Sequence, residues 1–251
     1  MKTALKQFLK YYLKYITKLV LLIHRPLVIG VTGSINEVFT KDEIKRQLTA
    51  TGLEARSNPK NFNTEIGLPL AILNLPSGYG SYKDWLPIIW QAFESIFNLK
   101  FPKILILGLG VSDPGDMKYL MSLVKPKIAV ITDITQRYIA SFADMNKLAK
   151  EYEYFIKLMD KDGYLILNHD NQRIKKLAEF KNDKTIFFGL AETGLKNYWR
   201  GQVMEKTLNG QVVKVTENGQ TTEYQINRFG QHHIYALMIG LIVKKIVLNF
   251  K

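Results

Sequence analysis

The chain has 251 residues, and its 35 Lys and Arg against 22 Asp and Glu give a formal net charge of +13. Hydrophobic residues make up 47% and charged residues 23%, which excludes wholesale disorder and a collagen-like repeat. Cysteine is absent, so a disulfide framework and a thiolate metal site are excluded, as expected for a reducing cytosolic compartment. The positive charge indicates an anionic partner: a nucleic acid, a phosphorylated ligand or a membrane surface.

Residues 1–25 form a first unit, which carries basic side chains and no acidic ones. Lysines recur every fourth position on one predicted helical arc: Lys2, Lys6, Lys10, Lys14 and Lys18. Aliphatic and aromatic side chains occupy the predicted opposite arc: Leu5, Phe8, Leu9, Tyr12, Tyr15, Ile16, Leu19 and Ile23. This pattern predicts a basic amphipathic helix. Its apolar face either packs on the following domain or lies on an anionic membrane surface, and both can hold. The apolar run at 19–23 is too short for a transmembrane span, which needs roughly 20 residues.

Residues 26–251 show the pattern of an α/β domain. Short runs rich in β-branched residues are expected as strands at 27–31, 104–109, 128–131, 164–167 and 185–188. Longer stretches between them are expected as helices at 41–50, 84–97, 115–123 and 144–158. Alternation of this kind predicts a mostly parallel sheet flanked by helices.

The pattern changes from about residue 197. Short strands are expected at 202–207, 212–215 and 222–225, joined at Asn209-Gly210 and Asn218-Gly219, which are strong hairpin signals. We therefore predict a small antiparallel sub-sheet over about 197–228, followed by a last helix over 231–248.

A candidate phosphate-binding loop follows the first predicted strand. Gly30, Thr32, Gly33 and Ser34 form a strand that runs into a glycine turn, and a helix follows. This context is typical of phosphate loops, although a plain strand-to-helix turn has the same local pattern.

Further segments follow in a characteristic order: 61–70, 110–116, 125–133, 165–170, 188–190 and 230–233. Together with the loop they resemble the central ATP-binding domain of the Mur ligase family, from about residue 26 to the end, and most closely its D-alanyl-D-alanine-adding branch. The resemblance implies a P-loop-like α/β fold and ATP-dependent amide-bond formation through an acyl phosphate, with Mg²⁺. It also implies a substrate domain before this one and a closing domain after it.

The residues that would perform that chemistry depart from the family pattern. The family's loop ends in Gly-Lys-Thr, and Asn36, Glu37 and Val38 stand at those positions. The resemblance places a magnesium-binding Glu at Gly108 and a metal-binding His at Tyr138. The preceding Asn falls at Asp133, and the carbamylated Lys falls at Tyr152, or at Lys150 with a two-residue gap. We interpret the loop as a vestigial nucleotide site and expect no catalytic residue and no metal; ATP and Mg²⁺ would bind only if the family activity survives.

Other matching positions keep their residue types. Asn61, Asn63 and Glu65 match a segment that approaches the UDP-sugar substrate in the family, or they simply satisfy a loop and cap a helix. Asn168, Asp170 and His232 match positions on the nucleotide side; for the first two, a turn at the end of a strand explains the residue types equally well. The family's other two positions beside His232 carry His233 and Ala236.

These observations favour a degenerate central domain, a non-catalytic binding or scaffolding protein linked to peptidoglycan precursor synthesis. We expect it in the cytoplasm, peripheral at the inner membrane face. Expected partners are an anionic membrane surface, through the N-terminal helix, and a second ligase chain or cell-wall enzyme. Nucleic acid is not an expected partner, because no nucleic-acid motif occurs. The alternative is an ATP-dependent acid–amino acid ligase, or a subunit or fragment of one, that needs a partner chain.

Overall fold

A single nine-stranded sheet organises the molecule, in the order β2-β3-β1-β4-β5-β6-β7-β8-β9. The computed structural model describes residues 3–59, 62–79, 82–180 and 182–250. The strands are β1 Leu27–Thr32, β2 Arg56–Ser57, β3 Ile104–Gly108, β4 Ile128–Ile131, β5 Tyr164–Asn168, β6 Thr185–Gly189, β7 Tyr198–Thr207, β8 Gly210–Glu217 and β9 Gln220–Ile226. The α-helices are α1 Thr3–His24, α2 Glu37–Thr49, α3 Gly67–Leu73, α4 Tyr82–Glu94, α5 Asp116–Leu123, α6 Met145–Leu158, α7 Gln172–Leu177 and α8 Gln231–Leu248. Short 3₁₀ turns follow or link them: η1 Ser95–Phe97, η2 Gln136–Ser141 and η3 Ala178–Phe180.

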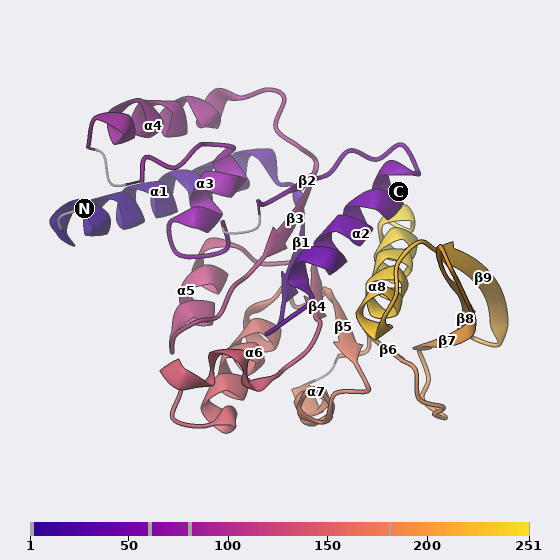
Figure 1. Cartoon of the computed structure of the whole chain (residues 1–251). Coiled ribbons are helices and arrows are strands. Elements are labelled where there is room, and N and C mark those ends of the chain that lie inside the picture. Colours follow the sequence, from indigo (N-terminus) through magenta and orange to yellow (C-terminus); the bar gives the residue numbers. More distant parts are fainter. Residues whose placement is uncertain (1–2, 60–61, 80–81, 181, 251) are drawn as a thin grey trace.

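Side chains of the parallel strands alternate between two cores, as the period of a strand requires. Val28, Leu105 and Ala129 face a core shared with α5 and α6. Their chain neighbours Ile29 and Ile106 face a core shared with α2 and α8. The result is three layers, in which α2 and α8 lie side by side on one face and α5 and α6 cover the other (Figure 1). The predicted fold class, a mostly parallel sheet flanked by helices, is confirmed.

The antiparallel part continues the main sheet. Strand β7 pairs parallel with β6 through Tyr198–Arg200, and then antiparallel with β8. Strand β8 pairs antiparallel with β9. The two hairpins turn where the Asn-Gly pairs predicted, with Asn218 in the left-handed region at a φ of 49°. They project from the edge of the molecule beyond α8 (Figure 1).

Helix α1 is part of a third hydrophobic cluster. Leu9, Leu13 and Val20 are fully buried against residues of α3 and α4. The expectation that this helix packs on the following domain is therefore confirmed.

The buried stripe of α1 differs from the predicted one. It includes Leu13 and Thr17, beside the lysine row, whereas Phe8, Tyr15 and Ile23 of the expected apolar face are at least half exposed. The helix is turned this way because its lysine row contacts the domain. Lys6 and Lys10 form ion pairs with Glu65, and the Lys10 and Lys14 ammonium groups lie 4.4 and 4.9 Å from the ring centre of Tyr119.

Helix α8 is the one described helix that is long and apolar enough to cross a membrane by length and composition. It is largely buried inside the molecule, where Leu237, Ile239 and Leu241 belong to the core shared with α2. We therefore describe it as a core helix.

Candidate functional site

The candidate loop lies at the carboxyl end of β1, in front of α2. Strand β1 has β3 on one side and β4 on the other, so the strands that follow β1 in the sequence are added on both sides of it. This is a switch point of a doubly wound sheet, the place where ligands bind in such folds. The ends of β3 and β4 carry Gly108 and Thr132-Asp133 to the same edge, and β5 brings Asn168.

Neighbouring strands hold the loop in shape. Gly33 has a φ of 150°, and a Cβ there would lie 2.1 Å from Thr132 Oγ1, so the turn requires glycine. The Ser34 N–H donates to Asp133 O at 2.8 Å, and Thr132 Oγ1 donates to Ile35 O at 2.7 Å. Asn36 then adopts the left-handed region before α2 begins at Glu37.

Gly30 and Thr32 serve the packing below the loop. A Cβ at Gly30 would lie 2.6 Å from Pro126 Cγ, so glycine allows close contact with the chain segment before β4. Thr32 is fully buried, and its hydroxyl donates to Leu109 O at 2.7 Å. Packing and a backbone hydrogen bond therefore account for the residue types at both positions.

Tyr152 supports the loop from below. Its side chain is fully buried in the core of α6, and its hydroxyl lies 3.3 Å from Ser34 Oγ. Ser34 Oγ in turn accepts a hydrogen bond from the Thr135 N–H at 3.0 Å. Tyr152, one of the two positions at which the resemblance places the carbamylated lysine, is thus part of the core, and the alternative position, Lys150, stays a prediction.

Glu37 occupies the space in front of the end of β3. A Cβ at Gly108 would lie 1.8 Å from Glu37 Oε1, so the carboxylate fills the volume that a side chain at Gly108 would need. Glu37 Oε1 also lies 3.4 Å from Lys41 Nζ, an ion pair longer than a good hydrogen bond. The next residue, Val38, is half-buried and has no side-chain atom that binds a metal.

Lys41 and Asn58 complete a buried polar cluster with Glu37. Lys41 Nζ donates to Asn58 Oδ1 at 2.9 Å and to Asn58 O at 3.1 Å. Asn58 also joins the end of β3, because its Oδ1 accepts from the Gly108 N–H at 2.8 Å. Asn58 was not a sequence candidate, because it follows the two-residue strand β2, which has no periodicity to detect.

Burial acts in opposite directions on the two charged groups. It raises the pKa of Glu37, against the opposing effects of Lys41 and Asn63. It lowers the pKa of Lys41, against the opposing effect of Glu37. Each charge therefore compensates part of the cost of burying the other.

The predicted substrate segment divides into separate roles. Asn61 lies outside the described residues. Asn63 contacts the end of β3, because its carbonyl accepts from the Gly110 N–H at 3.0 Å, and its side chain acts to lower the pKa of Glu37. Glu65 instead points to α1, where its oxygens lie 3.0 Å from Lys6 Nζ and 2.5 Å from Lys10 Nζ. Although burial alone would raise the pKa of Glu65, the two ammonium groups hold it below its usual value.

The predicted nucleotide-side residues organise the ends of strands. Asn168 is buried, donates to Thr132 O at 3.0 Å and accepts from the Asp170 N–H at 3.0 Å. Asp170 Oδ2 accepts from the Leu190 N–H at 2.6 Å and from the Tyr235 hydroxyl at 2.8 Å, which joins β5 to α8. These bonds favour the turn interpretation for both residues.

His232 lies at the start of α8 beside Phe39 of α2. Their ring centres are 5.2 Å apart, and those of His232 and His233 are 4.1 Å apart. The pKa of His233 is lowered by burial and by the charges of His232 and Arg228. No group of three or more His, Asp or Glu within the described part of the chain converges as a metal site. The Tyr138 and Lys2 side chains lie outside that part.

Residues 88–244 match the family model described as the Mur ligase middle domain, which covers more than half of the chain. The chain belongs to the Mur ligase family. The matched part begins beyond the candidate loop, so the family assignment does not rest on the loop residues.

Curated relatives of this Mur ligase domain are longer than the chain. The chain is 26% identical over 214 residues to the UDP-N-acetylmuramoyl-tripeptide–D-alanyl-D-alanine ligase of Bacillus subtilis. That match covers 85% of this chain and 40% of the Bacillus protein. It is 25% identical over 232 residues to the ligase of the same name from Borreliella burgdorferi. That match covers 87% of this chain and 42% of the Borreliella protein. The chain therefore spans less than half of the length of these relatives.

Solved structures show the same fold. The MurF ligase of Thermotoga maritima, determined in complex with ADP, superposes with a TM-score of 0.75 at 19% identity over 95% of this chain and 49% of that one. The MurF of Acinetobacter baumannii gives a TM-score of 0.73 at 14% identity over 96% and 46%. The predicted likeness to the D-alanyl-D-alanine-adding branch is confirmed.

Proposed function

We propose that the chain is a Mur ligase central domain that does not bind nucleotide productively. It would serve instead as a binding or scaffolding protein for peptidoglycan precursor synthesis, in the cytoplasm at the membrane face. The observation that carries this proposal is the Glu37 carboxylate at the start of α2, buried between Lys41 and Gly108.

Charge explains why this carboxylate opposes a polyphosphate. Two like unit charges roughly 4 Å apart repel by about 4 kcal/mol at an effective dielectric constant of 20. The lysine that the resemblance places here would attract the phosphates with a similar energy. Lys41 cannot replace it, because its ammonium group is turned toward Glu37 and Asn58.

A second candidate function is that of a ligase subunit that needs a partner chain. Two observations favour it: Gly33 and Ser34 keep the turn of a phosphate loop, and Glu37 holds a carboxylate close to where the resemblance expects one at position 108. The exchange of Glu from β3 to α2 would then keep an oxygen ligand at this edge of the sheet.

Calorimetric titration of the chain with Mg-ATP and Mg-ADP distinguishes the two functions. The first predicts no saturable heat, whereas micromolar binding contradicts it and favours the ligase subunit. A variant with Glu37→Lys, Val38→Thr and Gly108→Glu should acquire nucleotide binding, visible as a rise in melting temperature with Mg-ADP concentration. Glu54→Lys, at an exposed position after α2, makes the same change of charge as Glu37→Lys and should acquire none.

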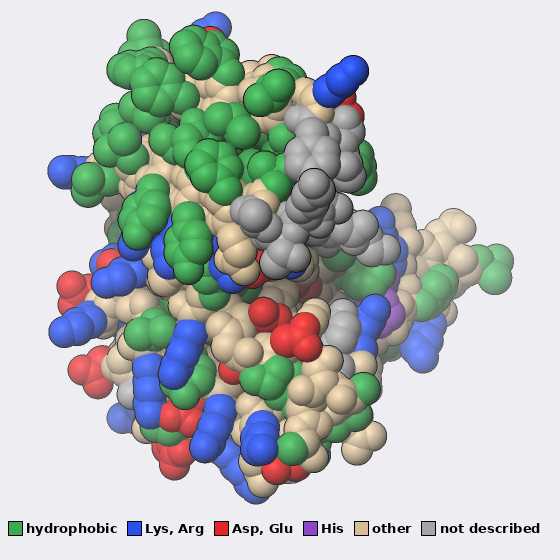
Figure 2. Space-filling model, turned by 90° about the vertical axis from the view of Figure 1, so that its left-hand side faces the viewer, with side chains coloured by type: hydrophobic (Ala, Val, Ile, Leu, Met, Phe, Trp, Pro, Cys, Tyr) green, Lys and Arg blue, Asp and Glu red, His purple; other side chains and the backbone are tan. Residues whose placement is uncertain are grey.

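Membrane attachment would use an exposed apolar surface, which we call the α1–α4 surface. It comprises Phe8, Tyr11, Tyr15, Leu19, Leu22 and Ile23 of α1 with Leu86, Trp90 and Phe93 of α4 and Phe97 of η1, each at least 41% exposed. Figure 2 shows hydrophobic side chains gathered over the upper half of this face, with Lys and Arg side chains mainly below and at its margins. Aromatic residues beside basic ones are typical of proteins that lie on anionic membranes.

Vesicle experiments test this attachment on the full chain, because deleting α1 would remove Leu9 and Leu13 from a buried cluster. The chain should pellet with anionic vesicles, and brominated lipids should quench Trp90, which is 64% exposed, but not Trp85, which is 3% exposed. Variants that keep either Trp90 or Trp85 as the single tryptophan, with Trp199 replaced in both, separate the signals. Failure to pellet, or equal quenching of both, contradicts the membrane proposal.

A further inference from the structure

A large groove lies at the opposite edge of the sheet from the phosphate loop. Its volume is about 1040 Å³, and it lies between the end of α1, α5, α6 and the amino ends of β1 and β4. We call it the amino-edge groove and define it by Lys18, Val28, Met121, Val124, Tyr154 and Leu158. The phosphate loop follows the carboxyl end of β1, so the groove is a separate site.

The floor of the groove is apolar. Val28, Met121 and Val124 are at most 7% exposed and belong to the core of the domain. At the mouth, Leu158 is 40% exposed, and Leu22, the residue that the groove shares with the α1–α4 surface, is 66% exposed. Apolar side chains left in water at the mouth of an apolar groove favour a ligand that covers them, by roughly 25 cal/mol per Å² buried.

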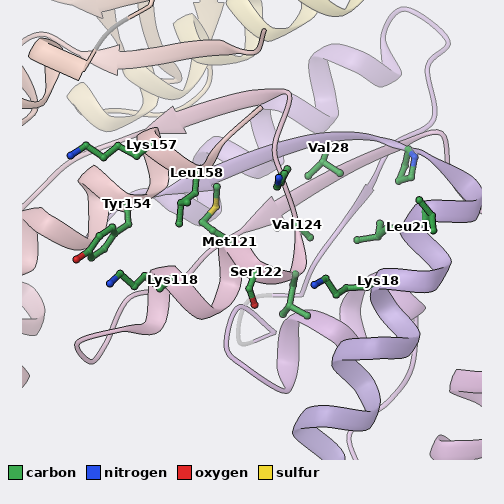
Figure 3. Close-up of a pocket in the computed structure, with 14 residues that line it drawn as sticks. Lys18, Leu21, Val28, Lys118, Met121, Ser122, Val124, Tyr154, Lys157 and Leu158 are labelled. Carbon is green, nitrogen blue, oxygen red and sulfur yellow. The ribbon is translucent and has the colours of Figure 1, made fainter. Parts of the chain in front are cut away.

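The rim of the groove is basic. Among the residues that the structure describes, four lysines line it, Lys18, Lys118, Lys125 and Lys157, and no acidic residue does. Lys157 forms an ion pair with Glu153, and Lys118 Nζ lies 4.3 Å from the ring centre of Tyr154. Lys18 reaches into the groove from α1, whereas Lys118, Tyr154 and Lys157 lie at the other end, with Met121, Val124 and Leu158 between them (Figure 3).

Positive potential at the α1 side comes from more than one charge. The pKa of Lys14 is lowered by burial and then by the nearby charges of Lys18 and Lys10. The acids Glu65 and Asp160 already have basic partners in Lys6, Lys10 and Lys127. An anion at Lys18 would therefore relieve repulsion within the lysine row.

We propose that the amino-edge groove binds a single-chain anionic amphiphile, with its hydrocarbon chain on the apolar floor and its head group at Lys18. A flat bilayer surface cannot reach Met121 or Val124 at the bottom of the groove, but a single chain can. The volume suits a chain of this kind, since small-molecule sites measure roughly 300–1,000 Å³. This inference is independent of the proposed loss of nucleotide binding.

Titration of the full chain with dodecyl phosphate, below its critical micelle concentration, tests the proposal. We expect one saturable site for dodecyl phosphate and no binding of inorganic phosphate. Dodecyl maltoside, which has a neutral head group, should bind at least about tenfold more weakly. Labelled methionine methyl groups give the location: the Met121 signal should shift, whereas that of Met204, on β7, should not.

Charge reversal tests the head-group contact. Lys18→Glu should weaken dodecyl phosphate binding about tenfold and leave dodecyl maltoside binding unchanged. Lys45→Glu makes the same change of net charge on α2, on the other face of the sheet, and should have little effect.

Three binding results would overturn the inference, and so would one result on the location of the ligand. They are the absence of saturable binding, equal affinity for the neutral amphiphile, and equal weakening by the two lysine variants. A Met121 signal that stays in place at saturation would also do so, because the ligand would then bind elsewhere, for example on the α1–α4 surface.

Discussion

The Glu37 carboxylate lies where a side chain at Gly108 would project, so this position of the carboxylate requires glycine at 108. The distance of 1.8 Å from Oε1 to a Cβ built on Gly108 is far inside van der Waals contact. Gly108 is the last residue of β3, and its backbone is held by Asn58, so it cannot easily move away. The family resemblance predicts a cation on the loop and a carboxylate on β3, whereas this chain carries a carboxylate at the start of α2 and a glycine at the end of β3.

A double-mutant cycle measures this dependence. Gly108→Ala should lower the free energy of unfolding by about 1–3 kcal/mol, because the new methyl group meets the Glu37 carboxylate. In a Glu37→Ala background the same change should cost clearly less, with a coupling energy of about 0.5–3 kcal/mol in urea unfolding.

The control for the cycle is Gly194→Ala. No heavy atom lies within 4 Å of a Cβ at Gly194, so its unfolding free energy should change by less than about 1 kcal/mol. Additive effects of Glu37→Ala and Gly108→Ala would show that the two positions do not share one volume.

Sequence reasoning identified Glu37 and Gly108 separately, each as a departure from the family pattern. It could not show that they meet, because contact between a helix start and a neighbouring strand end depends on the strand order β3-β1-β4. Asn58 was missed for the same kind of reason. It follows Arg56–Ser57, a strand too short to produce a period, and becomes important only through its bonds to Lys41 and Gly108.

A second carboxylate, Glu151 of α6, should contribute strongly to stability. It is buried and accepts from the Gly115 and Met117 N–H groups at 2.8 and 2.9 Å, at the start of α5. Glu151→Gln leaves one oxygen for two donors and should cost about 1–3 kcal/mol in urea unfolding.

Glu153→Gln is the matched control on the same helix. Glu153 forms a partly exposed ion pair with Lys157, which is worth less than about 1 kcal/mol. If the two variants lose the same stability, the buried bonds of Glu151 do not hold the start of α5.

In the parallel part, strands β1, β3, β4, β5 and β6 and helices α2, α4, α5 and α6 followed from periodicity, whereas β2 and α7 were not predicted. The last helix has the bounds that were predicted. The orientation of α1 could not be predicted from the sequence pattern, because a helix with lysines at every fourth residue can bury the arc on either side of its lysine row. The position of Glu65 decides it, since this carboxylate draws Lys6 and Lys10 toward the domain. That contact joins residues more than fifty positions apart, and no local pattern contains it.

Two leucines of α1 test this orientation by the same substitution. Leu13 is fully buried, whereas Leu19, on the face that the pattern predicted to be buried, is 41% exposed. Leu13→Ala should cost about 2–5 kcal/mol of unfolding free energy, and Leu19→Ala less than about 1 kcal/mol. Thermal or urea unfolding of both variants checks the order, and a larger loss for Leu19→Ala would restore the predicted face.

Asp133 gives the chain a pH dependence that can be isolated. Burial raises its pKa above the ordinary value of 3.8, against the hydrogen bonds from Asn171 and the Ile134 N–H. The protonated form is thus favoured by folding, so its contribution to stability is complete below pH 3.8 and is lost as the pH rises through the folded pKa. At neutral pH the half-buried carboxylate is charged at a cost. Asp133→Asn removes this cost, keeps the acceptor oxygen for both hydrogen bonds, and restores the residue type expected from the family.

The stability of Asp133→Asn relative to the unmodified chain should therefore increase from pH 4 to pH 7. Urea unfolding at three pH values across this range measures the difference, with Asp183→Asn, in an exposed turn, as the control for a change of charge alone. A difference that stays constant or shrinks with rising pH would mean that the Asp133 carboxylate is as well solvated in the folded chain as in the unfolded one. The end of β4 would then place no electrostatic cost beside the phosphate loop, and the anionic character of this site would come from Glu37.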